Sequence, residues 1–386
     1  MLFKPKNSVR IISCTLLYLL LTTACVPTPG LTPTLATPMP IAEGKGDSPA
    51  PTRAAVVTAS PASPCPSLST NPQAVTPFSP TQSKGALAFT ADGISIIDPS
   101  NQQITVIHSL HALGLNGWDR YPSWSPDGTR LAFLYTQAGP EDCARGYVML
   151  ADFQSGEVRR LTEGTELYGR PVWAQDSLHL ALIEARGRLD ILDVNSRKIT
   201  TLAQDAVAGV APVWQNTGVV YLRRAQDDQT TDLISQALDG TPPRVLLPNL
   251  YGAPVLTLSP DGKRAAVYRG YFAIVDLSSG REQNLGENPS ERLQWSPDAR
   301  RVLGRGGLAG LFLVQPDLAW EVIQVNVLGV PGAAQSWSPD SHRFAVLLGA
   351  DGQAGATIGI YDLNERALRE LSAEVQPPYD VAWSPK

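Results

Sequence analysis

One short segment, Trp124–Gly128 (WSPDG), recurs along the chain and constrains its fold more than any other feature. The copies are LSPDG at Leu258–Gly262, WSPDA at Trp295–Ala299, WSPDS at Trp337–Ser341, WSPK at Trp383–Lys386, and weaker forms that begin at Trp173 and Trp214. A catalytic site is normally built once, whereas a unit that repeats every 40 residues or so indicates a repeat architecture. We therefore interpret the segment as scaffold.

Ser-Pro-Asp-Gly matches a type I turn, because serine suits the first position, proline presets φ at the second and glycine suits the fourth. We expect the aspartates to cap these turns and the tryptophans to pack between neighbouring units. The predicted structural anchors are Trp124, Asp127, Trp173, Trp214, Asp261, Trp295, Asp298, Trp337, Asp340 and Trp383. Basic residues follow several turns, and we expect them to solvate hairpin tips: the pairs Lys263-Arg264 and Arg300-Arg301, and Arg130 and Arg343 singly.

Each unit contains several short apolar runs separated by turn residues, which predicts a four-stranded antiparallel sheet. The unit that begins near Gly85 lacks a WSPD opening, and the WSPK segment lacks the strands that should follow it. Joined, residues 379–386 and 85–107 make one complete unit, which predicts closure of a ring. The expected fold class is all-β, a seven-bladed β-propeller of four-stranded antiparallel blades with N/C-terminal ring closure. Six or eight blades are the alternatives.

These units resemble the repeats in the propeller of the TolB translocation protein and in the propellers of prolyl-oligopeptidase-type enzymes. The resemblance rests on W-S-P-D-G-x-x-L-A-F, followed by a strand that ends in Asp, and covers nearly all of 84–386. TolB has six blades and a separate N-terminal domain that has no counterpart here. The peptidases add a domain with a Ser-Asp-His triad, which is also missing. The resemblance implies a binding platform and carries over no catalytic residue.

The first 83 residues differ in composition from the rest of the chain. Residues 1–24 combine three cations with an apolar run too short to span a bilayer, which predicts an export signal. Leu21-Thr22-Thr23-Ala24-Cys25 resembles a bacterial lipobox, so we expect lipidation at Cys25, with an ordinary cleaved signal as the alternative. Residues 25–83, rich in Pro, Thr and Ser, predict a disordered tether. The expected localisation is the bacterial cell envelope, with the propeller (84–386) on the extracytoplasmic side of the membrane.

The remaining cysteines and the charge limit the partners. Cys65 and Cys143 are a possible disulfide in an oxidising compartment, with two separate thiols as the alternative. The formal net charge is −5, and removal of the signal makes the chain more acidic, which argues against nucleic acid as a partner. The sequence does not indicate the oligomeric state.

Motifs for catalysis and cofactors are weak throughout the sequence. There is no G-x-S-x-G, no HExxH and no P-loop, so we expect no catalytic residues, no metal and no cofactor. Gly304–Ala309 matches G-x-G-x-x-A, but another strand follows instead of the helix that a dinucleotide site requires. His108 and His111 are interpreted as exposed loop residues in preference to metal ligands. Asp227, Asp228 and Asp232 leave a weak possibility of calcium.

The best candidates for binding lie in the segments just before the anchors, which we expect to be loops gathered on one face of the ring. Tyr, Trp and Arg, the types enriched in interface hot spots, recur there. The candidate residues are Trp118, Arg120, Tyr121, Tyr168, Arg170, Tyr251, Arg292 and Tyr379. The hypothesis is a membrane-anchored, non-catalytic scaffold that binds a protein, a peptide or a glycan. The alternatives are a propeller enzyme (lactonase, lyase or hydrolase) and a module that senses small ligands.

Overall fold

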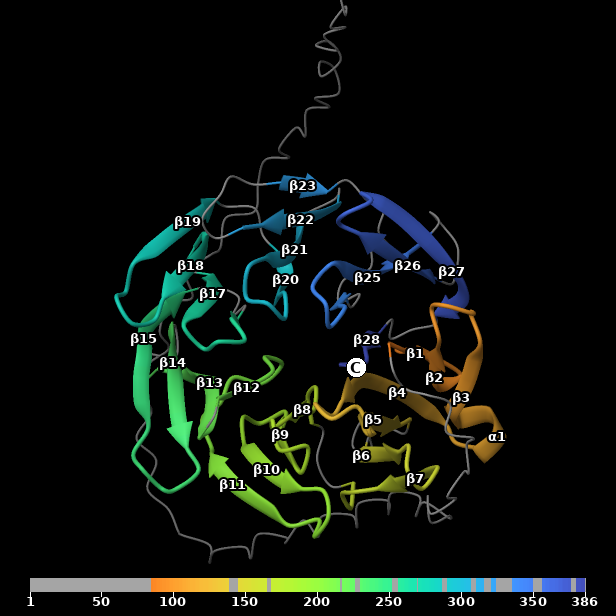
Figure 1. The fold of residues 1–386 in the computed structure, drawn as a ribbon. Helices are drawn as coiled ribbons and strands as arrows, with labels where there is room; N and C mark the ends of the chain where they lie inside the picture. The colour runs from red at the N-terminus through yellow and green to blue at the C-terminus, as the bar shows by residue number, and fades with distance from the viewer. Residues whose placement is uncertain are drawn as a thin grey trace, which may run out of the picture. The chain divides into compact units, whose positions relative to one another are not determined.

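The computed structural model describes residues 85–138, 145–164, 168–215, 217–225, 230–251, 256–268, 270–286, 290–306, 310–315, 321–323, 335–349, 356–375 and 380–385. These residues form seven four-stranded antiparallel sheets. Figure 1 shows the sheets arranged as blades around a ring. The seven-bladed propeller predicted from the repeats is confirmed, and six- and eight-bladed rings are excluded.

Each blade runs from an inner strand at the centre of the ring to an outer strand at its rim (Figure 1). The inner strands are β28 (Val381–Trp383), β4 (Gly117–Trp124), β8 (Val172–Trp173), β12 (Val213–Gln215), β16 (Leu256–Leu258), β20 (Ser290–Trp295) and β24 (Ser336–Trp337). The second strands are β1 (Leu87–Ala91), β5 (Arg130–Gln137), β9 (His179–Ile183), β13 (Gly218–Arg224), β17 (Arg264–Tyr268), β21 (Val302–Gly306) and β25 (Arg343–Leu348). The third strands are β2 (Gly93–Ile97), β6 (Arg145–Asp152), β10 (Leu189–Asp193), β14 (Thr230–Ala237), β18 (Phe272–Asp276), β22 (Gly310–Val314) and β26 (Ala356–Asp362). The outer strands are β3 (Ile104–Ser109), β7 (Glu157–Arg160), β11 (Ile199–Ala203), β15 (Arg244–Tyr251), β19 (Glu282–Gly286), β23 (Glu321–Ile323) and β27 (Ala367–Val375).

The first blade is closed by the last strand of the chain. β28 pairs antiparallel with β1, with Trp383 opposite Leu87 and Val381 opposite Phe89. The backbone N–H of Ser384 extends the pairing to the carbonyl of Ala86 at 2.8 Å. Pairing of this kind satisfies the inner edge of the first blade, which would otherwise expose unpaired backbone groups. The expected ring closure is therefore present.

The Ser-Pro-Asp turns have the capping geometry that the sequence predicts. In the first, Gly128 N–H donates to the carbonyl of Ser125 at 2.8 Å, and Asp127 Oδ1 accepts from the Ser125 hydroxyl at 2.6 Å and from Thr129 N–H at 3.0 Å. The serine–aspartate hydrogen bond recurs at Ser296–Asp298. The fourth turn position has a positive φ, 70° at Gly128 and 59° at Ala299, which explains the preference for glycine there.

The anchor tryptophans join each blade to the one before it. The indole N–H of Trp173 donates to the carbonyl of Ser123 on β4, at 2.8 Å, and Trp337 donates to Gln294 on β20, at 3.1 Å. Equivalent bonds cross three further junctions: Trp124 to Ala382, Trp214 to Val172 and Trp295 to Thr257. The indoles, all buried except the half-buried Trp214, therefore contribute both apolar area and a satisfied donor to these five junctions.

The arginines that follow the turns were expected to solvate hairpin tips, and this expectation is wrong for three of them. Arg130 donates to the carbonyl of Ser177 at 3.2 Å, Arg264 to Ala299 at 2.7 Å and Arg301 to Ser341 at 3.3 Å. Each acceptor lies in the turn of the following blade. The guanidinium groups of these three arginines therefore make a second set of inter-blade contacts, in addition to those of the tryptophans.

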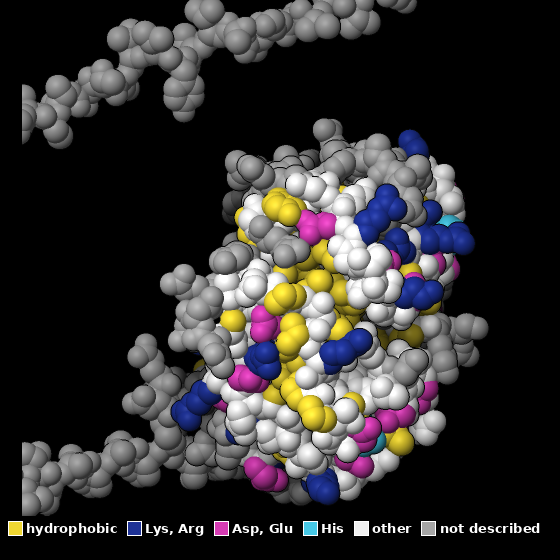
Figure 2. Space-filling model, turned by 90° about the vertical axis from the view of Figure 1, so that its left-hand side faces the viewer, with side chains coloured by type: hydrophobic (Ala, Val, Ile, Leu, Met, Phe, Trp, Pro, Cys, Tyr) yellow, Lys and Arg dark blue, Asp and Glu magenta, His cyan; other side chains and the backbone are white. Residues whose placement is uncertain are grey.

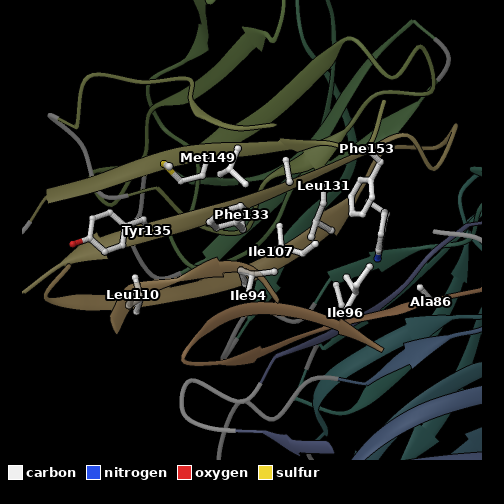
Figure 3. Packing of buried hydrophobic residues seen from close by; sticks show 14 of the residues in the cluster. Ala86, Ile94, Ile96, Ile107, Leu110, Leu131, Phe133, Tyr135, Met149 and Phe153 are labelled. Atoms are coloured by element: carbon white, nitrogen blue, oxygen red, sulfur yellow. The ribbon is translucent and has the colours of Figure 1, made fainter. Parts of the chain in front are cut away.

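Apolar side chains fill the space between neighbouring blades. The cluster between the first and second blades joins Ile94, Ile96 and Ile107 to Leu131 and Phe133, and all five side chains are buried. Figure 3 shows these side chains directed toward one another from strands β2, β3 and β5. Such burial is worth about 25 cal/mol per Å² of apolar surface, so the junctions account for much of the stability of the ring.

The outer rim carries exposed apolar side chains. Figure 2 shows the side of the ring that includes β15, where hydrophobic side chains lie among charged ones. On β15, Val245 is 45% exposed while Leu247 is buried in the core between blades. The apolar surface on this side thus continues an inter-blade core.

One short helix, α1 (Leu110–Leu113), interrupts the strands of the described chain between the first and second blades. Its first turn is capped by the Ser109 hydroxyl, which accepts from Ala112 N–H, and Gly114 ends it with φ of 63°. None of the helical segments in the described ranges has the length and apolar character needed to cross a bilayer.

Acid is expected to weaken the Ser-Pro-Asp turns. Partial burial tends to raise the pKa of Asp127 and Asp298, but hydrogen bonds from serine and backbone N–H groups and the nearby arginine outweigh it and lower the pKa. A carboxyl whose pKa is lower in the folded state stabilises the fold above the unfolded pKa of about 3.9, and this contribution is lost as the pH falls through the folded pKa. The full chain carrying Asp127→Asn and Asp298→Asn should therefore be less stable than wild type at pH 7. The difference in unfolding temperature should shrink as the pH falls below about 3.9, and an unchanged difference would contradict this role.

Candidate functional site

The ring differs from blade to blade at the position three residues before each anchor. That position holds Asp380, Tyr121, Arg170 and Ala211 in the first four blades. Because the Ser-Pro-Asp turns follow the anchors, residues that precede the anchors lie at the opposite end of the ring. The polar and aromatic members of these four come from the first three blades and meet there, whereas Arg292, at the same position in the sixth blade, is described by its backbone alone.

Asp380 joins these three blades and is 1% exposed. Its Oδ1 accepts from Nη2 of Arg170 in the third blade at 3.0 Å, and its Oδ2 accepts from the backbone N–H of Tyr121 in the second blade at 3.0 Å. Its own backbone N–H donates to the hydroxyl of Thr90 in the first blade at 3.1 Å. Asp380 is the residue that sequence reasoning missed. Its position at the repeat site of Tyr121 and Arg170 was the signal that could have found it.

Tyr121 lies between two guanidinium groups. The Cζ atom of Arg170 is 5.3 Å from the centre of the tyrosine ring, and that of Arg120 is 5.7 Å from it. Arg120 also lies over the ring of Trp118, at 5.6 Å. Trp118 is 40% exposed, so the far end of the group is open to solvent. The structure thus brings together four of the predicted residues, which we call the Trp118–Arg170 cluster: Trp118, Arg120, Tyr121 and Arg170.

The expected loop position of these residues is only partly right. Trp118, Arg120 and Tyr121 belong to strand β4, whose register with β5 shifts between Arg120 and Ser123. Tyr121 has φ of 58°, in the left-handed region, where a bulky residue is strained by about 1–3 kcal/mol. A bulge of this kind redirects side chains, and strain of this kind is concentrated at functional sites.

Tyr168 has a different environment from the other candidates. It is 9% exposed, and its hydroxyl donates to the fully buried Asp190 at 2.8 Å. Arg188 and Thr201 also donate to Asp190, at 2.9 and 2.8 Å. Burial first, and then the carboxylate of Asp190, raise the pKa of Tyr168 above its ordinary value, so the phenol stays protonated. This network braces the third blade, and we leave Tyr168 out of the proposed binding surface.

His108 was expected to be an exposed loop residue, and this is wrong. It is 2% exposed on β3, and its Nδ1 lies 2.6 Å from Oδ2 of Asp119 on β4. Its ring packs against Phe133. Burial raises the pKa of Asp119, and His108 opposes that rise. The pair links the first and second blades from within, while His111 lies at the exposed surface.

The other candidates are placed as follows. Tyr251 is the last residue of β15, and Arg292 lies within β20. The structure describes the backbone of these two residues but not their side chains. Tyr379, Cys25, Cys65, Cys143, Asp227 and Asp228 lie outside the described residues. Asp232 is described, and it pairs with Arg223 at 3.0 Å. Within the described part of the chain, no cluster of three or more His, Cys, Asp or Glu side chains could hold a metal ion. Gly304–Gly306 ends β21, which pairs with β22, so a strand and not a helix is described after the start of the G-x-G-x-x-A segment, as expected; residues 307–309 lie outside the described residues.

A cavity of about 930 Å³ lies at the end of the ring that carries the Ser-Pro-Asp turns, between the last and first blades. Asp98, Asp340 and Asp362 are among its lining residues. Each of these carboxylates already accepts from a backbone N–H of its own turn, at 2.8 to 3.0 Å. The acids of this cavity are therefore explained by the turns, and the Trp118–Arg170 cluster remains the stronger candidate site.

No known protein family matches the sequence, and no curated protein matches it. Many solved structures have a similar fold. An oligogalacturonate lyase from Vibrio parahaemolyticus is 13% identical over 74% of this chain and 86% of its own, with a TM-score of 0.53. A functionally unknown protein from Desulfotomaculum acetoxidans is 11% identical over 76% and 99%, with a TM-score of 0.53. TolB from Acinetobacter baumannii is 13% identical over 78% and 82%, with a TM-score of 0.48. At these identities the likeness concerns the fold alone, and the two structures with TM-scores of 0.53 agree with the propeller described above.

Proposed function

We propose that the chain is an extracytoplasmic β-propeller, anchored to the membrane through Cys25, that binds a protein, a peptide or an envelope glycan without catalysing a reaction. The binding surface in this proposal is the Trp118–Arg170 cluster. The anchor and the location rest on the signal, lipobox and tether of residues 1–83.

The observation that carries the proposal is the convergence of Trp118, Arg120, Tyr121 and Arg170 around a buried carboxylate. Repeated positions of the propeller serve the fold, whereas this group is specific to three blades, and fold alone does not determine function. It combines an exposed indole, two arginines and a strained tyrosine held by Asp380. Preorganised aromatic and arginine side chains of this kind are typical of binding hot spots.

The test is a pull-down from envelope extract with the detergent-solubilised full chain. A variant with Trp118→Ala, Arg120→Ala and Arg170→Ala removes the proposed surface. A matched control with Asp98→Ala, Glu365→Ala and Arg369→Ala alters the opposite end of the ring, at the cavity between the last and first blades. We expect a partner that is retained by wild type and by the control and is lost from the first variant.

Three results would contradict the proposal. A partner retained equally by the first variant and by wild type would show that the surface is wrong. Hydrolysis or elimination of a saccharide by the purified chain, abolished by a single substitution, would support the enzyme alternative. A thermal shift with free sugars or short peptides, without any retained protein, would favour the small-ligand alternative.

A further inference from the structure

We infer that the Arg120 guanidinium is a carboxylate-binding subsite and that its ligand is an acidic peptide segment of a partner protein. The inference rests on the proposed function, because it names the chemistry that the Trp118–Arg170 cluster recognises. Two observations support it: the Arg120 guanidinium lies over two aromatic rings, and it has no hydrogen-bond acceptor among the described residues.

The guanidinium of Arg120 has no hydrogen-bond acceptor among the described residues. Its Nε atom is buried and unpartnered, and no described carboxylate forms an ion pair with it. A buried donor without an acceptor costs about 1–3 kcal/mol. An unsatisfied buried donor in a native protein calls for a functional explanation.

Other arginines near this end of the ring are neutralised. Arg170 pairs with Asp380 at 3.0 Å, and Arg188 pairs with Asp190 at 2.9 Å. Both carboxylates are buried and already engaged. The pairing of Arg170 with Asp380 leaves the Trp118–Arg170 cluster with one uncompensated positive charge, on Arg120. That charge stands out in a chain whose formal net charge is −5.

The guanidinium is held in place by rings instead of by hydrogen bonds. Trp118 and Tyr121 lie 5.6 and 5.7 Å from its Cζ atom. Arg120 is partly exposed while its Nε is shielded, so the terminal amino groups are the part of the guanidinium that a ligand reaches. A planar guanidinium with two free amino groups matches the geometry of a carboxylate, which accepts two parallel hydrogen bonds.

The surroundings favour a peptide as the source of that carboxylate. Trp118 offers an exposed ring beside the charge, and Tyr121 and Arg170 continue the surface into the third blade. Trp, Tyr and Arg together are the residue types that dominate protein–protein hot spots. A Glu or Asp side chain of the peptide would bind the Arg120 guanidinium, and apolar residues beside it in the peptide would pack against the ring of Trp118.

The experiment measures binding of the full chain to two immobilised pools of random heptapeptides. One pool carries Asp or Glu at three positions, and the other carries Asn or Gln at the same positions. We expect wild type to prefer the acidic pool at least tenfold and Arg120→Gln to abolish that preference. Arg120→Lys, which keeps the charge and loses the planar fork, should retain only part of it. Arg281→Gln, the same change at an exposed arginine on the rim side of the fifth blade, should leave it intact.

A second readout separates binding from folding. If Arg120 serves binding, Arg120→Gln should leave the unfolding temperature unchanged or raise it, because a buried donor is no longer left without an acceptor. A fall of several degrees would assign Arg120 to the fold and would overturn the inference. Equal binding of both pools, or binding of alginate oligomers in place of either pool, would overturn it as well. If the envelope partner still requires the Trp118–Arg170 cluster under those results, the proposed function stands and only the acidic peptide is wrong.

Discussion

Trp337→Ala is expected to lower the free energy of unfolding by about 3–5 kcal/mol, the range observed when buried aromatic side chains are truncated. Trp337 is 5% exposed, packs edge-on against Phe344 and donates its indole N–H to the carbonyl of Gln294 in the preceding blade. The substitution removes the apolar contact and leaves that inter-blade carbonyl without its donor. The measurement is equilibrium unfolding in urea, followed by circular dichroism.

Trp118→Ala is the matched control, because it removes the same side chain from a site where the ring is 40% exposed. No indole hydrogen bond of Trp118 links described blades, so we expect a loss of less than about 1 kcal/mol, as is usual for surface positions. If the two alanine variants were equally destabilised, the anchor role of the WSPD tryptophans would be wrong.

The fold could be predicted from sequence because its turns and its repeats each require particular residue types at neighbouring positions. A turn that needs Ser, Pro, Asp and a positive φ restricts the residue types at four consecutive positions, as at Ser125–Gly128. Repetition of that restriction reveals the number of blades. Ring closure followed from counting, since the strand that ends at Trp383 needed a partner and the strand at Leu87 lacked one. The turn depends on residues that are adjacent in the chain, and the number of blades depends on the spacing of the repeats. Both can be read from a sequence.

The inter-blade contacts of polar side chains could not be predicted in the same way. Arg301 reaches Ser341 and His108 reaches Asp119 only because two blades adjoin at a certain register and twist. The same local sequence fits an arginine that is solvated and an arginine that donates a hydrogen bond to the turn of the next blade. Three-dimensional placement alone separates them, and it also separates the buried Tyr168 from the partly exposed Trp118.

The candidate site, too, could be predicted from the sequence only in part. The residue types before the anchors indicated Trp118, Arg120, Tyr121 and Arg170, and the structure brings these together. Asp380 was passed over in favour of its neighbour, although its carboxylate, at the shared repeat position, binds both Tyr121 and Arg170. The bulge at Tyr121, which depends on the pairing of β4 with β5, has no signal in the sequence that separates it from an ordinary strand.

Asp380→Ala is expected to lower the free energy of unfolding by about 2 kcal/mol. Removing one partner of a buried ion pair usually costs more, about 3–5 kcal/mol, because the other charge stays buried. Here Arg170 is 30% exposed and can turn to solvent, which reduces the cost. The remaining loss comes from the Tyr121 N–H, which loses its acceptor while the backbone stays at φ of 58°. Equilibrium unfolding in urea measures the loss.

Asp362→Ala provides the control, because Asp362 caps an exposed turn in the neighbouring blade by accepting from the backbone N–H groups of Asn364 and Glu365. We expect it to cost less than about 1 kcal/mol, because both donors are at an exposed turn where water can replace the carboxylate. Combining Asp380→Ala with Arg170→Met tests whether the two side chains act as a unit, since the cost of Asp380→Ala should shrink when Arg170 is absent. Additive costs would mean that Asp380 stabilises Tyr121 alone. In that case Arg170 would be held by the ring of Tyr121, and the Trp118–Arg170 cluster would be ordered by its aromatic contacts instead of by its buried carboxylate.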